Sequence, residues 1–265
     1  MNVHTAIEQP PLLRQDESGV AWLTLNRPAA RNALSVGLMQ ALDAALVAVA
    51  EDASVRVVVI AAAGPAFCAG HDLREMRANQ DRSFTEALFA QCSALMTRIV
   101  RLPKPVIARV HGIATAAGCQ LVASCDLAVA ATHARFATPG VNIGLFCSTP
   151  MVALSRAVGR KAAMEMLLTG DMIDAAQARD LGLINRVVPA DQLDETVAAL
   201  AGQIAAKSAL TLAIGKEAFY RQAEMDLDAA YRYAAEAMTR NMMARDAAEG
   251  IDAFLAKRAP VWTDS

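Results

Sequence analysis

Two segments rich in small residues are the part of this sequence best suited to chemistry. Phe67–Leu73 (FCAGHDL) follows an apolar run, and Pro105–Leu121 (PVIARVHGIATAAGCQL) passes from an apolar stretch into alanines and glycines. Small side chains let a ligand approach the backbone closely, and free N–H groups at the start of a helix stabilise a developing oxyanion. The same residues would also let a helix and a strand pack closely without any ligand. Both interpretations stay open at the level of residue type.

Signatures of several other kinds of site are absent from the sequence. It contains no GxGxxG, GxxxxGK[ST], HExxH or GxSxG segment, which argues against nucleotide-cofactor, zinc-protease and serine-hydrolase sites. The cysteines are odd in number, widely spaced and in apolar contexts, without a CxxC pair or a Cys/His spacing that suits zinc; they are Cys68, Cys92, Cys119, Cys125 and Cys147. We therefore expect no metal site and a reducing, cytoplasmic setting.

Composition and charge exclude further classes of protein. The 25 Lys and Arg residues nearly balance 27 Asp and Glu residues, so there is no basic field for nucleic acid. The mean hydropathy is +0.28, yet no uninterrupted run approaches the roughly 20 apolar residues that cross a bilayer. Met1–Gly19 lacks the basic and apolar blocks of a secretory signal. We expect a cytoplasmic protein without nucleic-acid or membrane partners, whose apolar surplus is buried in its core and a subunit interface.

The pattern along the chain places the two segments in an α/β fold. Apolar runs predict strands at 20–25, 55–60, 106–110 and 127–130, and amphipathic runs predict helices at 36–50, 84–100 and about 117–124. This alternation favours a mostly parallel sheet over the first 150 residues. From about Thr149 the pattern is helical throughout, with helices at 161–168, 174–180, 190–206, 209–223, 227–243 and 244–258. A helical part this long should pack on the α/β core or on a neighbouring subunit.

A series of motifs in a fixed order resembles the crotonase (enoyl-CoA hydratase/isomerase) superfamily. The motifs are Leu25–Pro28 with Asn32–Leu34, Phe67–Leu73, Pro105–Gly112, Cys125–Leu127, Phe136–Pro139, Arg156–Gly159, Glu165–Gly170, Ala178–Val188 and Phe254–Arg258. Within the superfamily, the stretch FATPGVNIGLFCSTP looks closest to the branch of enoyl-CoA hydratase domain-containing protein 3. The resemblance covers nearly the whole chain.

This resemblance implies a fold and a ligand. The fold is a crotonase-like spiral of ββα units (residues 1–200), followed by a helical C-terminal trimerisation region (residues 201–265). The assembly is a homotrimer or a dimer of trimers. The ligand is an acyl-CoA thioester, with coenzyme A as part of the substrate and no separate cofactor. The resemblance implies that the backbone N–H groups of His71 and Ala117 donate hydrogen bonds to the thioester oxygen. We expect Ala117 to do so without positive φ.

The resemblance also implies contacts to the CoA thioester around the two small-residue segments. The matching positions are Ala29, Ala30, Arg31, Ala69, Gly70, Asp72, Leu73 and Gly118, with Asn142 as a polar contact to the acyl group. Lys257 in the last helix matches a lysine that reaches the CoA phosphates of a neighbouring subunit. An ordinary solvated lysine at a helix end is the alternative for this residue.

The sequence departs from the family at both glutamates that hydratases use to add water. The first position matches Gln120, which can hold a water molecule but does not exchange a proton near neutral pH. The second matches Gly140, which has no side chain; Pro139 and Gly140 suit positions i+1 and i+2 of a type II turn. Because each lost acid or base group costs about 10²- to 10⁴-fold in rate, little hydratase activity is expected by the usual route.

Three functions therefore remain open. One is weak hydration, with Gln120 holding the water. Another is a different enolate or acyl-transfer reaction that uses Cys147, Asp72 or the His71 side chain. The third is acyl-CoA binding without catalysis. Cys147 is a nucleophile only if the helix that follows it lowers its thiol pKa; a buried small hydrophobic residue is the alternative.

Overall fold

The computed structural model describes residues 9–265, and its larger sheet has six strands in the order β1-β2-β3-β5-β7-β10. The strands are β1 (Leu12–Glu17), β2 (Val20–Leu25), β3 (Val57–Ala62), β5 (Val106–Val110), β7 (Leu127–Ala131) and β10 (Arg186–Val188). Neighbours in this sheet are parallel, apart from the antiparallel pair of β1 with β2. Every residue of β3 is buried, as expected for a parallel strand covered on both faces.

A second, smaller sheet gives the fold its repeating unit. It contains β4 (Ala66–Cys68), β6 (Ile113–Thr115), β8 (Arg135–Ala137) and β9 (Ile173–Asp174) in that order. The strands β4, β6 and β8 are parallel to one another, and each follows a long strand of the first sheet after a short loop. A long strand, a short strand and a helix therefore form one ββα turn, and successive turns stack. The predicted crotonase-like spiral is confirmed.

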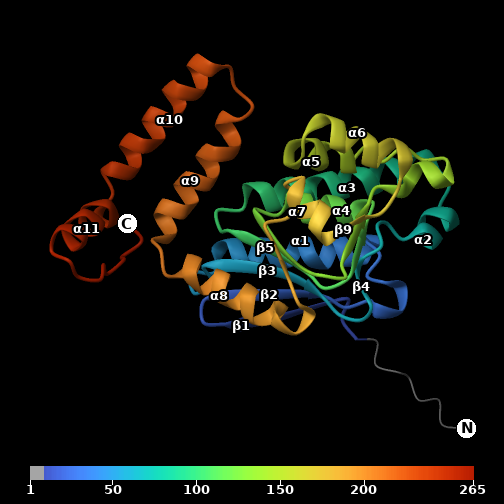
Figure 1. Cartoon of the computed structure of the whole chain (residues 1–265), viewed down its shortest axis with the longest axis horizontal. Helices are drawn as coiled ribbons and strands as arrows, with labels where there is room; N and C mark the ends of the chain where they lie inside the picture. The colour runs from blue at the N-terminus through green and yellow to red at the C-terminus, as the bar shows by residue number, and fades with distance from the viewer. Residues whose placement is uncertain (1–8) are drawn as a thin grey trace, which may run out of the picture.

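Helices cover both faces of the larger sheet (Figure 1). On one face lie α1 (Val36–Glu51), α3 (Arg82–Arg101) and α4 (Ala117–Ser124); on the other lies α8 (Leu193–Ala205), preceded by the short η3 (Ala190–Gln192). Successive side chains of β3 point to opposite faces of the sheet, so this strand packs against the helices on both faces. Val58 and Ile60 belong to the main core, whereas Val57 and Val59 pack with the side chains of α8.

Shorter elements connect these layers and surround the ends of the strands. They are η1 (Pro28–Ala30), α2 (Leu73–Ala78), η2 (Pro139–Ile143), α5 (Pro150–Ala157), α6 (Arg160–Thr169) and α7 (Ala175–Asp180). Several begin with a polar cap: Asp72 accepts backbone N–H groups at the start of α2, and Asp174 forms a capping box with Gln177 at α7. The helix α4, like α5 and α6, has no side-chain cap at its first turn.

The last three helices form an arm that extends away from the sheets (Figure 1). They are α9 (Ala209–Gln222), α10 (Leu227–Met242) and α11 (Arg245–Leu255). The arm exposes many large apolar side chains, among them Phe219, Leu227, Tyr231, Met238, Met242, Met243, Phe254, Leu255 and Val261. The predicted division between residues 200 and 201 falls inside α8, which packs on the sheet, so the arm itself starts at α9.

No single helix in the described part of the chain is long and apolar enough to span a membrane. Two consecutive segments, Ala190–Ala205 and Ala209–Gln222, meet the same criteria of length and composition only when taken together, across a bend of 101°.

The structure differs from the sequence-based expectations mainly at short elements. The prediction that the chain is helical throughout after Thr149 is wrong at β9 and β10, which have two and three residues. Pro139 and Gly140 do not form the predicted type II turn; they begin η2, and Gly140 is not among the glycines with positive φ. In this segment the glycine with a left-handed backbone is Gly144, which follows the last residue of η2.

Candidate functional site

The start of α4 packs tightly against the loop that follows β4. A Cβ atom at Gly118 would lie 2.8 Å from the carbonyl carbon of Cys68, so only glycine fits at this position. Gly70 has a φ of +98°, and a Cβ atom there would lie 3.0 Å from Ala116 Cβ and 3.6 Å from Ala117 N. The two small-residue segments are therefore in direct contact.

Two backbone N–H groups are free at this junction. His71 forms a parallel bridge with Leu34, in which Leu34 N donates to Gly70 O and Asp72 N donates to Leu34 O. In a parallel bridge of this kind the N–H of the middle residue, His71, points to the opposite side. Ala117 is the first residue of α4, where the N–H has no partner within the helix. Neither N–H has an acceptor elsewhere among residues 9–265.

The backbone immediately before α4 is strained. Ala116 has φ +50° and ψ −118°, a conformation that favours glycine. Ala117 itself does not have positive φ, as predicted, but the residue before it does. Ala116 N donates to Ala137 O at 2.9 Å and Gln120 N donates to Ala116 O, so bonds on both sides hold the strained residue. Such strain costs about 1–3 kcal/mol and is typical of functional sites.

Gln120, which the sequence resemblance matches to the first hydratase glutamate, lies inside the protein. It is 4% exposed, and its Oε1 atom lies 3.9 Å from the Cys92 thiol, which donates to it. The turn that carries it is fixed further by the Ser124 hydroxyl, which donates to Gln120 O at 2.8 Å. No carboxylate hydrogen-bonds to this amide in the described chain, so the position provides a neutral donor and acceptor.

Gly140, which the sequence resemblance matches to the second hydratase glutamate, lies where the fold leaves no room for a side chain. A Cβ atom there would overlap the carbonyl oxygen of Leu145 and lie 2.9 Å from Cys147 Sγ. Leu145 N donates to Gly140 O at 2.9 Å, so this loop folds back over the glycine. Position 140 therefore requires glycine because the backbone of Leu145 and the sulfur of Cys147 approach it closely, and not because of the conformation of a turn.

The His71 side chain is a candidate base beside these groups, because one of its two ring nitrogens has no hydrogen-bond partner among the described residues. Its Nδ1 atom lies 3.4 Å from Leu34 O, and its ring meets Phe89 edge to face at 5.6 Å between centroids. The Nε2 atom is buried and has no hydrogen-bond partner among the described residues. Burial lowers the pKa of His71 below its ordinary value, so the ring is neutral at pH 7 and Nε2 can accept a proton.

Both carboxylate oxygens of Asp72 are occupied by hydrogen bonds and an ion pair within the protein. One carboxylate oxygen accepts the backbone N–H groups of Arg74 and Glu75, and the other forms an ion pair with Arg27 at 2.9 Å. Burial alone would raise the pKa of Asp72, but the bonds from Arg27 and the backbone lower it overall. Glu75 is committed in the same way, because its Oε2 accepts the N–H of Val36 at the start of α1.

Cys147 does not meet the condition for a nucleophile. Its side chain is buried, and burial raises the pKa of the thiol. Two residues separate it from the start of α5 at Pro150, and its sulfur lies close to Gly140. The alternative interpretation, a buried small residue, describes it better.

A model of the enoyl-CoA hydratase/isomerase family matches residues 15–265. The chain belongs to this family.

Individual relatives agree with the family and with the branch inferred from sequence. Enoyl-CoA hydratase domain-containing protein 3 from Rattus norvegicus is 48% identical over 94% of this chain and 83% of its own length. The crystal structure of the human protein of that name superposes with a TM-score of 0.93 at 47% identity, over 95% of this chain and all of the other. An enoyl-CoA hydratase from Mycobacterium smegmatis superposes with a TM-score of 0.94 at 59% identity, over 96% and 99%.

The names of these relatives overturn the expected cytoplasmic setting. The proteins from rat, frog and human are all named as mitochondrial. The expectation rested on the composition of Met1–Gly19 and on the cysteines, and neither decides between compartments that are both reducing. Residues 1–8 of that segment lie outside the described part of the chain.

Several of the expected CoA contacts of this enoyl-CoA hydratase/isomerase family member lie together. Ala29 and Ala30 are in η1, Arg31 follows with φ +51°, and Ala69 N donates to Arg31 O at 3.1 Å. Leu73, at the start of α2, is 53% exposed. These residues form one surface beside Gly70, and their role in binding stays a prediction.

Two other expected contacts lie apart from that surface. Asn142 is an exposed residue of η2 whose Nδ2 faces Gly170, at the end of α6. Lys257 follows α11 with φ +54°, and α11 belongs to the arm, away from α4 (Figure 1). The role of Lys257 toward a neighbouring subunit stays a prediction.

Sequence reasoning missed the role of Asn32, which organises the surface around Arg31. Asn32 is fully buried with φ +54°, a conformation that asparagine tolerates. Its Nδ2 donates to Ala63 O and Ala66 O at 2.7 and 2.8 Å, and its Oδ1 accepts Arg27 N at 2.8 Å. The buried amide thus joins the loops that follow β2 and β3. Its position in the Asn32–Leu34 motif was the available signal.

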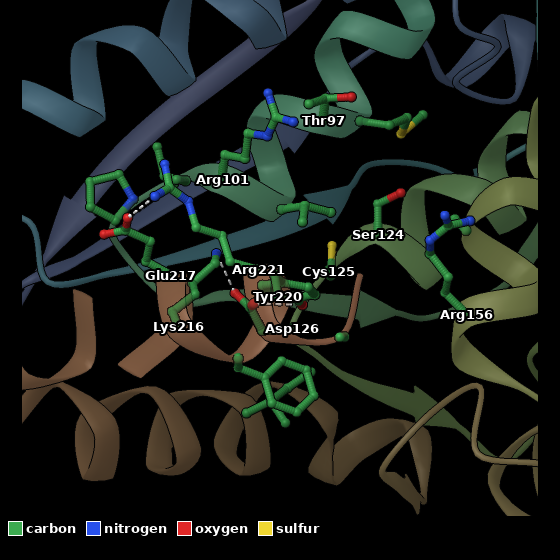
Figure 2. Close-up of a pocket in the computed structure, with 18 of the residues that line it drawn as sticks. Thr97, Arg101, Ser124, Cys125, Asp126, Arg156, Lys216, Glu217, Tyr220 and Arg221 are labelled. Carbon is green, nitrogen blue, oxygen red and sulfur yellow. Dashed lines mark hydrogen bonds and ion pairs between the residues drawn. The ribbon is translucent and has the colours of Figure 1, made fainter. Parts of the chain in front are cut away.

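A buried ionic cluster that joins the arm to the core was also missed (Figure 2). Lys216 of α9 forms an ion pair with Asp126 at 2.6 Å and donates to Ile99 O and Lys104 O, both at 3.0 Å. Tyr220 donates to the other oxygen of Asp126 at 2.9 Å. The ammonium group thus has three acceptors, as buried lysines require.

No group of three or more His, Cys, Asp or Glu side chains in residues 9–265 could hold a metal ion.

Proposed function

We propose that this chain binds an acyl-CoA thioester and holds the thioester oxygen between the backbone N–H groups of His71 and Ala117, without the acid–base pair of a hydratase. The two N–H groups lie at a junction of small residues and have no acceptor within the described chain. Preorganised N–H donors are the groups that stabilise the oxyanion of an enolate. Coenzyme A enters as part of the substrate, and the proposal includes no separate cofactor.

The observation that carries the proposal is the contact of Gly140 with Leu145. A hydratase needs one group to deprotonate water and another to deliver a proton to carbon. The carbonyl oxygen of Leu145 stands where a side chain at position 140 would begin, and Gln120 cannot exchange a proton near neutral pH. The loss of two acid–base groups reduces the rate about 10⁴-fold or more.

The proposal is tested with two CoA thioesters. Crotonyl-CoA reports hydration through loss of its conjugated absorbance, and acetoacetyl-CoA reports oxyanion stabilisation through the absorbance of its enolate. We expect acetoacetyl-CoA to bind with an increase in enolate absorbance, and crotonyl-CoA to be hydrated no faster than in buffer. Rapid crotonyl-CoA hydration would refute the loss of hydratase chemistry, and failure to bind either thioester would refute the ligand.

The contribution of one donor is separable from folding. Proline at the first position of a helix has no N–H, so Ala117→Pro removes a proposed donor, and thermal unfolding checks that the variant keeps its fold. Arg160→Pro is the matched control, because Arg160 is the exposed first residue of α6. Ala117→Pro is expected to lower the enolate signal about 10²-fold, with the control unchanged. Equal signals in both variants would place the thioester elsewhere.

A second candidate function follows from the unpartnered Nε2 of His71. A neutral imidazole beside a thioester can take a proton from the α-carbon, whose electron pair then moves onto the oxygen to form the enolate; the proton returns to carbon afterwards. This exchange is measured in deuterium oxide by mass spectrometry of butyryl-CoA. Exchange that His71→Leu abolishes, with binding retained, supports the base. An absence of exchange leaves binding without catalysis, the third function considered.

The exposed apolar side chains of the arm support assembly into a homotrimer or a dimer of trimers. In that assembly Lys257 of one subunit would reach the CoA phosphates bound to its neighbour. Light scattering measures the mass of the assembly, and Lys257→Ala is expected to weaken CoA binding several-fold without a change in mass. A monomer with full affinity for CoA would contradict both parts.

A further inference from the structure

The corner between α8 and α9 is held by side chains from distant parts of the chain. The segment that ends at Ala205 meets α9 at an angle of 101°. Three consecutive carbonyl groups at this corner accept side-chain hydrogen bonds: Ala205 O from Arg56 Nε, Ala206 O from Trp262 Nε1, and Lys207 O from Arg56 Nη2. Carbonyl groups at the end of a helix have no partner within it, and a cation there is stabilising. Residues outside both helices therefore fix the direction in which α9 leaves the core.

Arg56 and Asp264 meet at this corner, although 208 residues separate them in the sequence. Arg56 directly precedes β3, and its Nη1 and Nη2 atoms contact the two carboxylate oxygens of Asp264 at 2.6 and 3.2 Å. Asp264 Oδ1 also accepts the N–H of Ala209, the first residue of α9, at 2.7 Å. The guanidinium thus lies at the C-terminal end of α8 and the carboxylate at the N-terminal end of α9, where each charge stabilises its helix. A single ion pair joins the sheet to both helices.

The segment that follows α11 returns to this corner (Figure 1). Asp246, near the start of α11, is 2% exposed and binds the returning segment. Its Oδ1 accepts Thr263 N at 2.7 Å and the Thr263 hydroxyl at 3.0 Å, and its Oδ2 accepts Asp264 N at 3.0 Å. A Cβ atom at Gly250 would lie 3.2 Å from the ring of Trp262, so the indole packs on α11. The segment therefore joins the last helix of the arm to the start of the first.

These contacts close a ring within one chain. The arm leaves the core at the corner, runs through α9, α10 and α11, and returns to the same corner through Trp262 and Asp264. A rotation of the arm about the corner has to break the bonds from Arg56, Trp262 and Asp264 together. The proposed oxyanion donors and the expected CoA contacts do not include any of these three residues.

We propose that Arg56, Asp246 and residues 262–264 form a latch that fixes the direction of the arm within each subunit, so that a second copy of the chain meets an apolar surface that is already ordered. A segment that is ordered only on association costs free energy at that step, and a segment ordered beforehand avoids the cost. The arm carries exposed apolar side chains such as Phe219, Tyr231 and Met238. The inference rests on the assembly named in the proposed function, and it adds the device that prepares each subunit for assembly.

Asp264→Ala tests the latch, because it removes the ion pair with Arg56 and the bond to Ala209 N. Hydrogen–deuterium exchange measures local opening at residues 206–212, at a concentration where both proteins are fully associated. Mass photometry over a dilution series measures association. We expect exchange at least 10-fold faster than in the unmodified protein, and a concentration of half-association at least 10-fold higher, with the same mass at high concentration.

Asp180→Ala is the matched control, because it breaks the exposed ion pair of Asp180 with Arg179; it should change neither measurement. Asp264→Asn removes the charge and keeps an acceptor for Ala209 N, so it should shift both measurements in the same direction by a smaller factor. This second variant decides the matter if Asp264→Ala does not fold.

The outcomes separate the latch from the proposed function. Unchanged exchange in both Asp264 variants would show that the corner holds without the ion pair, and would overturn the latch. Faster exchange with unchanged association would overturn its role in preparing the arm. An unmodified protein that is monomeric at every concentration would refute the proposed assembly and this inference with it, whereas the assays with CoA thioesters decide the binding part of the proposed function independently.

Discussion

The carbonyl oxygen of Leu145 lies against the Cα of Gly140, in the space that any side chain at position 140 would need. The bond from Leu145 N to Gly140 O holds the two residues together at 2.9 Å. The path of the backbone therefore leaves no room for a glutamate side chain at position 140. We expect that a change of this residue alone does not place a working carboxylate there.

The first prediction is that glutamates at positions 120 and 140 do not restore hydration. In Gln120→Glu/Gly140→Glu the new side chain at 140 displaces the Leu145 loop, and we expect a loss of about 2 kcal/mol or more in unfolding free energy, as for an overpacked core. Chemical denaturation measures the loss, and the crotonyl-CoA assay measures hydration. Gln120→Glu alone is the control, because it alters charge with little change in volume. A stable double variant with rapid hydration would contradict the prediction.

The second prediction concerns the strain at Ala116. Glycine adopts φ +50° and ψ −118° without the penalty that alanine carries, so Ala116→Gly should raise the unfolding free energy by about 1 kcal/mol despite the extra freedom of the unfolded chain. Thermal unfolding measures the change. The control is Ala199→Gly in α8, which should lower stability by about 1 kcal/mol because glycine weakens helices. Equal losses in both variants would show that Ala116 is not strained.

Much of the fold is encoded in long runs of residues. The apolar runs at 20–25 and 106–110 became β2 and β5 with the predicted bounds. The second sheet was not predicted, because strands of three residues are too short to show a periodicity. The strand β1 was missed for a different reason: as an exposed edge strand, Leu12–Glu17 is mostly polar.

The candidate site was predictable where it depends on local chemistry. The small residues before Gly118 indicated close approach of backbones, and the two segments do meet. The roles of Asn32 and Asp126 were not predictable, because their partners come from distant parts of the chain; Lys216 is 90 residues from Asp126. Conformation at Ala116 and space at Gly140 depend on contacts that only the folded chain defines.

The third prediction is that the ionic cluster stabilises the attachment of the arm. Lys216→Met leaves the Asp126 carboxylate without its cation at a site where both side chains are largely buried, so the unfolding free energy should fall by about 3 kcal/mol. Tyr220→Phe removes one hydrogen bond to the same carboxylate and should cost about 1 kcal/mol. Urea denaturation measures both variants.

An exposed ion pair is the control that separates the effect of burial on stability from the effect of charge. Arg156 and Glu224 are both more than half exposed, so Arg156→Ala should cost less than 1 kcal/mol. Comparable losses in Lys216→Met and Arg156→Ala would mean that burial adds nothing to the cluster.

The last prediction is that His71 makes the protein less stable in acid. Burial lowers the pKa of its imidazole in the folded state below the ordinary 6.5, so the folded protein favours the neutral ring and the unfolded chain binds the proton more readily. The stability contributed by the neutral ring is complete above pH 6.5 and declines as the pH falls from there toward the folded-state pKa. The slope for one proton is at most about 1.4 kcal/mol per pH unit. Denaturation at pH 7.5, 6.5 and 5.5 should show a smaller loss for His71→Gln than for the unmodified protein, and identical losses would show that His71 takes up its proton equally well in both states.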